Sequence, residues 1–142
     1  MADAIHIQIA DAVKAALDAV DFDVDVTITR GYLAFFDLES APEDPAILVA
    51  PGPTNIDSAA GGLESDAIDF AINIALIRRA ENDAEADECI KVTEDIYFTL
   101  RNSVMAGGRC ITKQIPLVYD EEALRDQKTF RSVMRFIFRR VE

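Results

Sequence analysis

The stretch TFRSVMRFIFRRV, residues 129 to 141, decides how the rest of the chain is interpreted. On a period of two, large apolar side chains fall on one face and arginine alternates with aliphatic residues on the other, as in a half-buried strand. The spacing of four between the arginines also fits one stripe of a helix, so this segment alone leaves both interpretations open. In the strand interpretation, the second face holds Arg131, Val133, Arg135, Ile137 and Arg139.

Upstream of this stretch, hydrophobic periodicity divides the chain into two kinds of segment. A period near 3.6 predicts helices over residues 3 to 20 and 81 to 104. The polar residues 120 to 128 predict a short helical turn or a loop. Alternation, or short apolar runs bounded by proline and glycine, predicts strands over residues 21 to 29, 32 to 40, 45 to 50, 66 to 79 and 109 to 119.

The order of these segments predicts an α+β fold, with a mostly antiparallel sheet of about six strands and two main helices packed on one face. An unpaired sheet edge promotes aggregation, so completing the sheet favours a strand at residues 129 to 141. A chain of 142 residues, half of them hydrophobic, has the size of one domain, covering residues 1 to 142. Within it, the proline- and glycine-rich PGPTNIDSAAGG, residues 51 to 62, predicts an exposed and flexible loop.

Acidic residues are concentrated in the N-terminal half of the chain. Positions 1 to 70 hold 14 acids against Lys14 and Arg30, whereas positions 71 to 142 hold 12 acids and 12 bases, for a net charge of −12. Five bases and no acid lie between Lys128 and Arg140, but the overall charge repels a polyanion at long range. No apolar run is long enough to span a membrane, and an acid at position 3 does not fit a secretory signal, so we expect a soluble, cytosolic chain.

The residues that usually carry catalysis are sparse in this sequence. His6 is the single histidine and has no partner that spacing can assign, and the common phosphate-, zinc- and redox-binding motifs do not occur. Cys89 and Cys110 are 21 positions apart without a second pair, which is typical of reduced, part-buried thiols. We therefore predict a protein that is not an enzyme and that carries no cofactor.

One acidic segment imitates a metal site. Asp21, Asp23 and Asp25 have the spacing of the first ligands of a calcium loop. The sixth position, however, is Val26 where glycine is needed, and the twelfth is Tyr32 where glutamate is needed. This mismatch argues against calcium, and we predict no metal site.

The arginine-bearing side of residues 129 to 141 has two interpretations. Long basic side chains often line a solvated sheet face, where they pair with acids on neighbouring strands. Alternatively, arginine stems together with Val133 and Ile137 form a surface that contacts another subunit, because interface cores favour arginine and aliphatic groups.

Three stretches taken together resemble the tail-completion proteins of tailed bacteriophages, in particular the tail terminators at the neck. They are TRGYLAFFDLE followed by AILVAPGP, then DFAINIALIRRA leading into an acid-rich helix, and finally PLVYDEEALRDQKTFRSVMRFIFR. The resemblance lies in the order and spacing of hydrophobic blocks from about Val26 to Arg140. In that family the segment after YDEEAL is the last strand of the sheet, which supports the strand interpretation.

The resemblance implies a structural virion protein that assembles as a ring, typically a hexamer. Such a ring caps the tail tube made of the major tail tube protein, ends its polymerisation and joins the tail to the head-closure or connector protein, while DNA passes through without specific binding. The expected location is the virion neck, after assembly in the host cytoplasm. On this basis Arg131, Val133, Arg135, Ile137 and Arg139 are candidates for the subunit interface. The residues predicted to contact the tail tube or the lumen are Thr54, Asn55, Ile56, Asp57 and Ser58.

Two alternatives compete with the terminator. Another neck component, such as a head-closure or minor tail protein, has a similar size and architecture. From a different class, a nucleic-acid-binding module would use the basic C-terminal strand, with Phe130, Phe136 and Phe138 stacking on bases if they were exposed. Alternation argues against this second alternative, because it places the phenylalanines on the face opposite the arginines.

Overall fold

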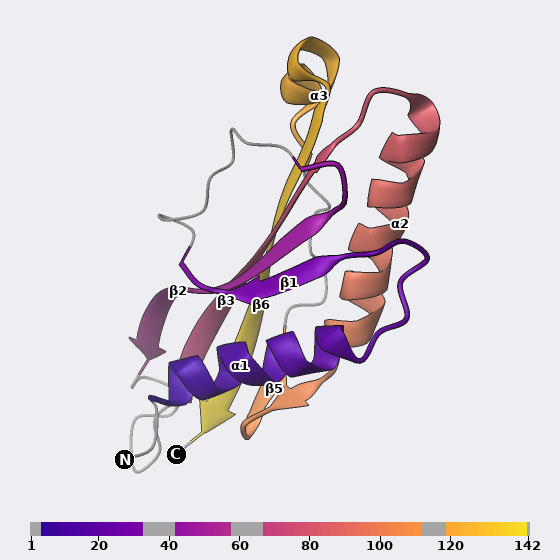
Figure 1. Cartoon of the computed structure of the whole chain (residues 1–142). Coiled ribbons are helices and arrows are strands. Elements are labelled where there is room, and N and C mark those ends of the chain that lie inside the picture. Colours follow the sequence, from indigo (N-terminus) through magenta and orange to yellow (C-terminus); the bar gives the residue numbers. More distant parts are fainter. Residues whose placement is uncertain (1–3, 33–41, 58–66, 112–118, 142) are drawn as a thin grey trace.

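The C-terminal stretch is a strand. A computed structural model describes residues 4–32, 42–57, 67–111 and 119–141 (Figure 1). In it, Thr129–Val141 forms strand β6, which pairs antiparallel along its whole length with strand β3, Ala67–Arg79. Side chains of β6 alternate between buried and more exposed from Phe130 to Arg139, which confirms the predicted period of two.

Six strands form one sheet around this central pair. The others are β1 (Thr27–Arg30), β2 (Ala46–Asp57), β4 (Val104–Met105) and β5 (Gly108–Cys110). Their spatial order is β1-β2-β3-β6-β5-β4, and every neighbouring pair is antiparallel except β1 and β2. The predicted α+β class with a mostly antiparallel sheet is therefore confirmed.

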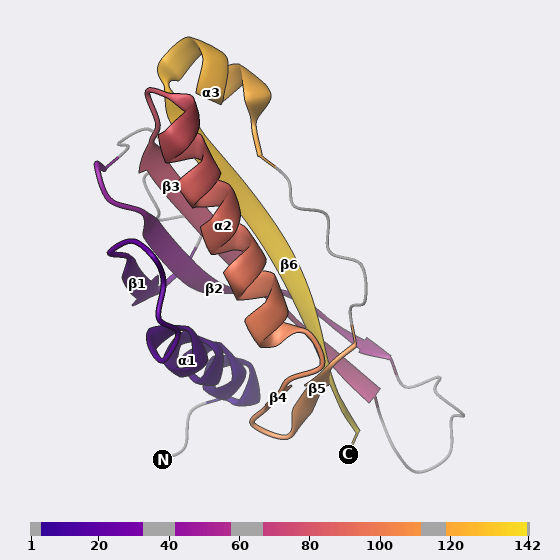
Figure 2. The same ribbon diagram turned by 90° about the vertical axis from the view of Figure 1, so that its right-hand side faces the viewer.

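Two long helices cover one face of the sheet, and a short one lies at its end. Figures 1 and 2 show α1, Ile5–Asp18, and α2, Asp83–Leu100, on the same side, with α3, Glu121–Gln127, beyond the start of β6. The Asn82 side chain caps α2 by accepting a hydrogen bond from the Glu85 amide at 2.9 Å. Acidic residues in the first turn of α2 favour the same start through the helix dipole.

The core lies between the sheet and these two helices. Ile9, Val13 and Leu17 of α1, one face of α2, and the even-numbered residues of β3 and β6 form one buried cluster. On the sheet it includes Phe70, Ile72, Ile74, Leu76, Met134, Phe136 and Phe138. Leu48, Ala50 and Ala75 form a second buried cluster on the other side of the sheet.

The segment predicted as a strand over residues 21 to 29 is a strand only from Thr27 onward. Its alternation is nevertheless real, because Phe22, Val24 and Val26 pack against the core while the aspartates between them are exposed. A period of two requires only an extended backbone that borders the core. It does not require a neighbouring strand with which to form a ladder.

The loop predicted over residues 51 to 62 was placed wrongly in its first part. Strand β2 continues to Asp57, and its register against β3 shifts between Pro51 and Thr54. Such an irregularity accommodates proline, which cannot donate to the ladder, so the proline and glycine signal marked a bulge rather than the end of the strand. Residues 58 to 62 lie outside the described residues.

Other predicted boundaries also differ. The helix predicted over residues 81 to 104 ends at Leu100, and the strand predicted over residues 109 to 119 is described only as the short β5, paired with β4 in a hairpin. The remainder of that strand, and residues 33 to 40 of another predicted strand, lie outside the described residues. Of the two options for residues 120 to 128, the structure has a helix.

Candidate assembly surface

The five residues predicted for a subunit interface share one side of β6. Residues 131, 133, 135, 137 and 139 alternate with the buried side chains of the core, so they lie on the sheet face opposite α1 and α2. The register places Asp69, Ala71, Asn73 and Ala75 of β3 directly beside Arg139, Ile137, Arg135 and Val133. We call this surface, together with Arg109 of β5, the arginine face.

Two of the arginines contact polar residues of β3. Arg139 forms a bidentate ion pair with Asp69, with Nε to Oδ1 at 2.8 Å and Nη2 to Oδ2 at 3.0 Å. Arg135 donates from Nε to Oδ1 of Asn73 at 3.1 Å. Asp69 and Asn73 therefore orient the two guanidinium groups, and each arginine keeps an exposed side chain. Bidentate geometry of this kind holds a flexible side chain in one direction.

Arg131 lies at the edge of this surface and is less exposed. Its Nη2 donates a hydrogen bond to the side-chain oxygen of Gln127, at the end of α3. Its Nε is buried and has no hydrogen-bond partner among the described residues. Part of the guanidinium is thus committed to the adjoining helix, and Arg135 and Arg139 are the arginines of β6 that face outward.

Arg109 is a member of the arginine face that the sequence did not predict. Hydrogen bonding between β5 and β6 places Arg109 directly beside Arg139. The β4–β5 hairpin presents it through a two-residue turn with positive φ at Ala106 (49°) and Gly107 (81°), a geometry that suits tight hairpins. No ion pair of Arg109 with an acidic residue occurs within the described parts of the chain. Two like charges opposite each other repel, so an anionic partner is favoured there.

Aliphatic side chains lie between these charges. Val133 is 39% exposed, which is high for valine, and Ile137 is partly exposed. The neighbouring Ala71 and Ala75 of β3 are 3% and 1% exposed, so the exposed apolar groups of this surface come from β6. Aliphatic groups surrounded by arginine match the composition of protein interfaces. The alternative interpretation, a solvated sheet face whose arginines pair with acids on neighbouring strands, also fits in part, because Arg139 is paired with Asp69.

The predicted tail-tube residues lie closer to the arginine face than the sequence suggested. Thr54, Asn55, Ile56 and Asp57 belong to β2, and Ser58 lies outside the described residues. In the backbone register, Asn55 pairs with Asp69, which in turn pairs with Arg139. The end of β2 therefore lies in the same part of the sheet as Arg139 of β6. Only β3 separates these two strands.

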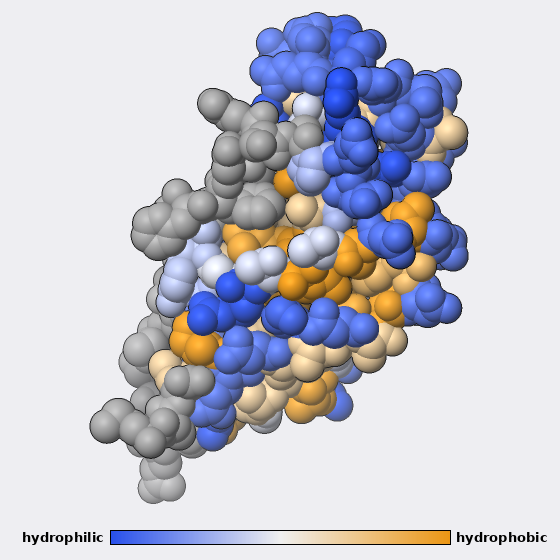
Figure 3. Space-filling view, viewed as in Figure 1, coloured by the Kyte–Doolittle hydropathy of each residue, from blue (hydrophilic) through white to orange (hydrophobic). Residues whose placement is uncertain are grey.

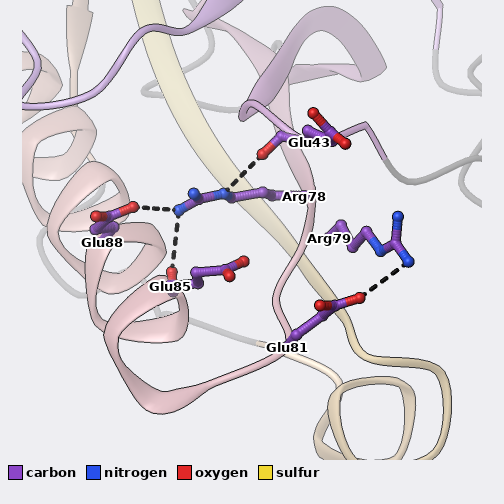
Figure 4. Close-up of a pocket in the computed structure, with 6 residues that line it drawn as sticks. All are labelled: Glu43, Arg78, Arg79, Glu81, Glu85 and Glu88. Carbon is purple, nitrogen blue, oxygen red and sulfur yellow. Dashed lines mark hydrogen bonds and ion pairs between the residues drawn. The ribbon is translucent and has the colours of Figure 1, made fainter.

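A second charged cluster joins three chain segments around Arg78 (Figure 4). Arg78 is 9% exposed and donates to the Glu43 carbonyl at 3.1 Å, to the Glu85 carbonyl at 3.2 Å and to the Glu88 carboxylate at 2.6 Å. Burial by itself would lower the pKa of Arg78, but hydrogen bonds to Glu88 and Cys89 outweigh it and raise the pKa above its usual range. These contacts tie the end of β3 to the start of α2, which is a structural role.

The Arg78 cluster borders an open cavity of ≈ 380 Å³. Besides the residues above, Arg79 and Glu81 line it, and they form an ion pair of 2.9 Å with each other. Each of its two arginines is thus paired with a glutamate, whereas Glu43 and Glu85 form no ion pair within the described residues. Among the described residues, no group of histidine, cysteine, aspartate and glutamate is arranged to hold a metal ion. Likewise, none of the described helices is long and apolar enough to cross a membrane.

Comparison with solved structures shows a shared fold. The chain is similar to a chain in the virion of a native gene transfer agent particle, with a TM-score of 0.59 and 16% identity over 97% of this chain and 98% of that chain. It is also similar to the sheath/tube terminator of an extracellular contractile injection system in its extended state, with a TM-score of 0.52 and 15% identity. That match covers 94% of this chain and 56% of the terminator chain.

These two similarities define the class of fold. Both neighbours are structural components of virion or tail-like particles, and at such low identity the similarity concerns the fold alone. No protein-family model and no curated protein matches the sequence.

Proposed function

We propose that this protein is a structural, non-catalytic component of a tailed-phage virion that forms a homo-oligomeric ring, a hexamer, at the neck. The ring caps the tail tube, ends its polymerisation and joins the tail to the head connector. Its partners are further copies of itself, the major tail tube protein and the head-closure protein, and DNA passes through it without specific binding. It assembles in the host cytoplasm.

The fold supports this role through its neighbours. One is titled a sheath/tube terminator, and the other is a chain in the virion of a native gene transfer agent particle. Together with the sequence resemblance to tail terminators, they favour a tail-completion protein over the other neck components.

The observation that carries the proposal is the difference between the two sides of the subunit. The arginine face, with Arg109, Arg135 and Arg139, lies on one side of the sheet, and helices α1 and α2 lie on the other. The outer surface of α2 begins with Asp83 and Asp87, both exposed. A head-to-tail ring needs two different and complementary faces on every subunit, and two sides of unlike charge supply them.

The end of β2 is the proposed contact with the tail tube. It adjoins the arginine face through β3, so one end of the sheet serves both a neighbouring subunit and the tube. Shortening this segment removes the β2 pairs of Thr54, Asn55, Ile56 and Asp57, so substitutions of single residues test it better than a deletion.

The proposal is tested by the solution mass of the purified protein, measured by light scattering with and without purified tail tubes and followed by negative-stain imaging. We expect a ring of about six subunits, either alone or at one end of the tube. Arg135→Glu reverses a charge of the arginine face and is expected to prevent the ring. Arg125→Glu in α3, where Arg125 is exposed, is the matched control and is expected to assemble normally. A wild-type protein that stays monomeric beside tail tubes contradicts the proposal.

The nucleic-acid alternative loses its main support in the structure. Phe130, Phe136 and Phe138 are 1%, 0% and 0% exposed, so their rings are packed in the core and do not stack on bases.

A further inference from the structure

A groove lies on the helix side of the subunit, between the segment before β1 and the middle of α2. Its volume is ≈ 230 Å³, and it is lined by Asp23, Val24, Asp87, Glu88, Lys91 and Val92. Val24 and Val92 pack toward the core and give it an apolar floor, whereas the charged residues form its rim. Figure 3 shows hydrophobic surface near the segment between α1 and β1, bordered by hydrophilic side chains.

The acids of this rim differ in how they are satisfied. Glu88 accepts from Arg78 at 2.6 Å, and Lys91 forms an ion pair with Asp95 at 2.6 Å. The remaining two, Asp23 and Asp87, are exposed and form no hydrogen bond or ion pair within the described residues. Lys91 also interacts electrostatically with Asp23, but it is shared with Asp95, so the rim of the groove keeps an excess of negative charge.

An apolar floor with an acidic rim matches the chemistry of a long basic side chain. The methylene stem of an arginine packs on aliphatic groups, and its guanidinium pairs with carboxylates in bidentate geometry. A purely apolar or an acidic partner would leave the two aspartates desolvated without compensation.

We infer that this groove receives arginines from the arginine face of a second copy of the chain. The inference rests on the proposed ring and names the two surfaces that meet in it. Arg109 and Arg135 form no ion pair with an acid among the described residues of their own subunit. Asp87 forms none with a base, and Asp23 shares the charge of Lys91 with Asp95. Both charge deficits are satisfied when the arginine face of one subunit docks on the groove of the next.

The placement of the two surfaces also fits a ring. The groove lies on the side of the sheet covered by α2, and the arginine face lies on the opposite side. A contact between opposite sides of identical subunits is head-to-tail and leaves each subunit with one surface open for the next. A contact of this kind gives a ring when the rotation between successive subunits closes, as the proposed function requires.

The first test is a groove variant, Asp23→Lys with Asp87→Lys, compared with Glu121→Lys with Glu122→Lys as a matched charge change on the exposed surface of α3. Because the exchanged residues are exposed, circular dichroism and the unfolding midpoint are expected to stay close to wild type. We expect the groove variant to need at least a tenfold higher concentration to assemble, whereas the control assembles like wild type.

The second test mixes two variants that carry opposite defects. A face variant, Arg109→Gln with Arg135→Gln, keeps the groove and has a neutral face that does not attract the lysines of the groove variant, and the groove variant keeps the arginine face. Each is expected to be monomeric alone, and their mixture is expected to give one-to-one dimers that do not grow, because only one contact is complete.

The outcomes separate this inference from the proposed function. If wild type forms rings and the groove variant forms them at the same concentration, the groove is not the contact, although the ring proposal stands. If wild type forms no ring even beside tail tubes, the proposed function itself fails. Mixed variants that remain monomeric while wild type forms rings also overturn the pairing of these two surfaces.

Discussion

The two sides of strand β6 differ in burial and composition although they share one backbone. Phe136 is fully buried under the helices, whereas Val133, three residues earlier on the same strand, is 39% exposed on the arginine face. The helix side holds the fold together by removing apolar surface from water. The arginine side presents charge and a few aliphatic groups, and little of it contributes to the stability of the single subunit. Residues that stabilise the fold and residues of the proposed assembly surface thus alternate along the strand.

The largest contrast is expected between Phe136→Ala and Val133→Ala. Truncating a fully buried phenylalanine costs about 3–5 kcal/mol of unfolding free energy, because it combines lost transfer energy with a cavity. Val133→Ala on the same strand is expected to cost less than about 1 kcal/mol, since its side chain is already partly in water. Urea denaturation of the two variants measures the difference, and equal losses contradict the separation of the two sides.

Charge on the helix side gives the next effect. Arg78→Met removes three hydrogen bonds and leaves two carbonyls and the Glu88 carboxylate to find other partners. We expect a loss of about 1–3 kcal/mol, limited because the Glu88 side chain is 43% exposed and regains water. Arg79→Met is the matched control on the adjacent exposed residue, with an expected change below about 1 kcal/mol. Similar unfolding free energies for both variants contradict a structural role for Arg78.

On the arginine face, Asp69→Asn is expected to lower the unfolding free energy by about 0–1 kcal/mol, since the pair with Arg139 is partly exposed. The loss has two sources, the broken ion pair and the repulsion between Arg139 and Arg109, which Asp69 no longer offsets. In an Arg109→Gln background the loss is therefore expected to be smaller. A double-mutant cycle that shows no coupling between positions 69 and 109 contradicts this arrangement.

The smallest expected effect concerns the burial of Cys89 on the helix side of the sheet. Burial raises the pKa of the Cys89 thiol, and the hydrogen bond from Arg78 opposes this only in part. In the unfolded chain the thiol has a pKa of about 8.5, so the unfolded state releases its proton first as pH rises. Stability is therefore fully present below this pH and falls above it, until the folded thiol titrates as well. We expect a shallower fall in Cys89→Ala, and identical slopes of unfolding free energy against pH would show that Cys89 is not buried from water.

Local patterns carried much of the fold. The even-numbered apolar residues of Ala67–Arg79 predicted a strand, and the 3.6-residue period predicted the two long helices. The arginines of β6 were grouped correctly because alternation is a property of the backbone itself. The prolines at positions 51 and 53 misled the prediction, since proline is compatible with either a loop or an irregular strand and only the pairing with β3 distinguishes the two.

By itself, the sequence determined which side chains each strand and helix presents together, because these groupings follow from local backbone geometry. It determined the acidic and basic parts of the chain for the same reason. Only the tertiary structure decided which strands are neighbours, and so placed Arg109 and Asp69 on either side of Arg139. It also buried Arg78 among Glu43, Glu85 and Glu88 and placed Asp23 across a groove from Asp87. Contacts between residues distant in the chain depend on how whole elements pack, and no local period encodes that.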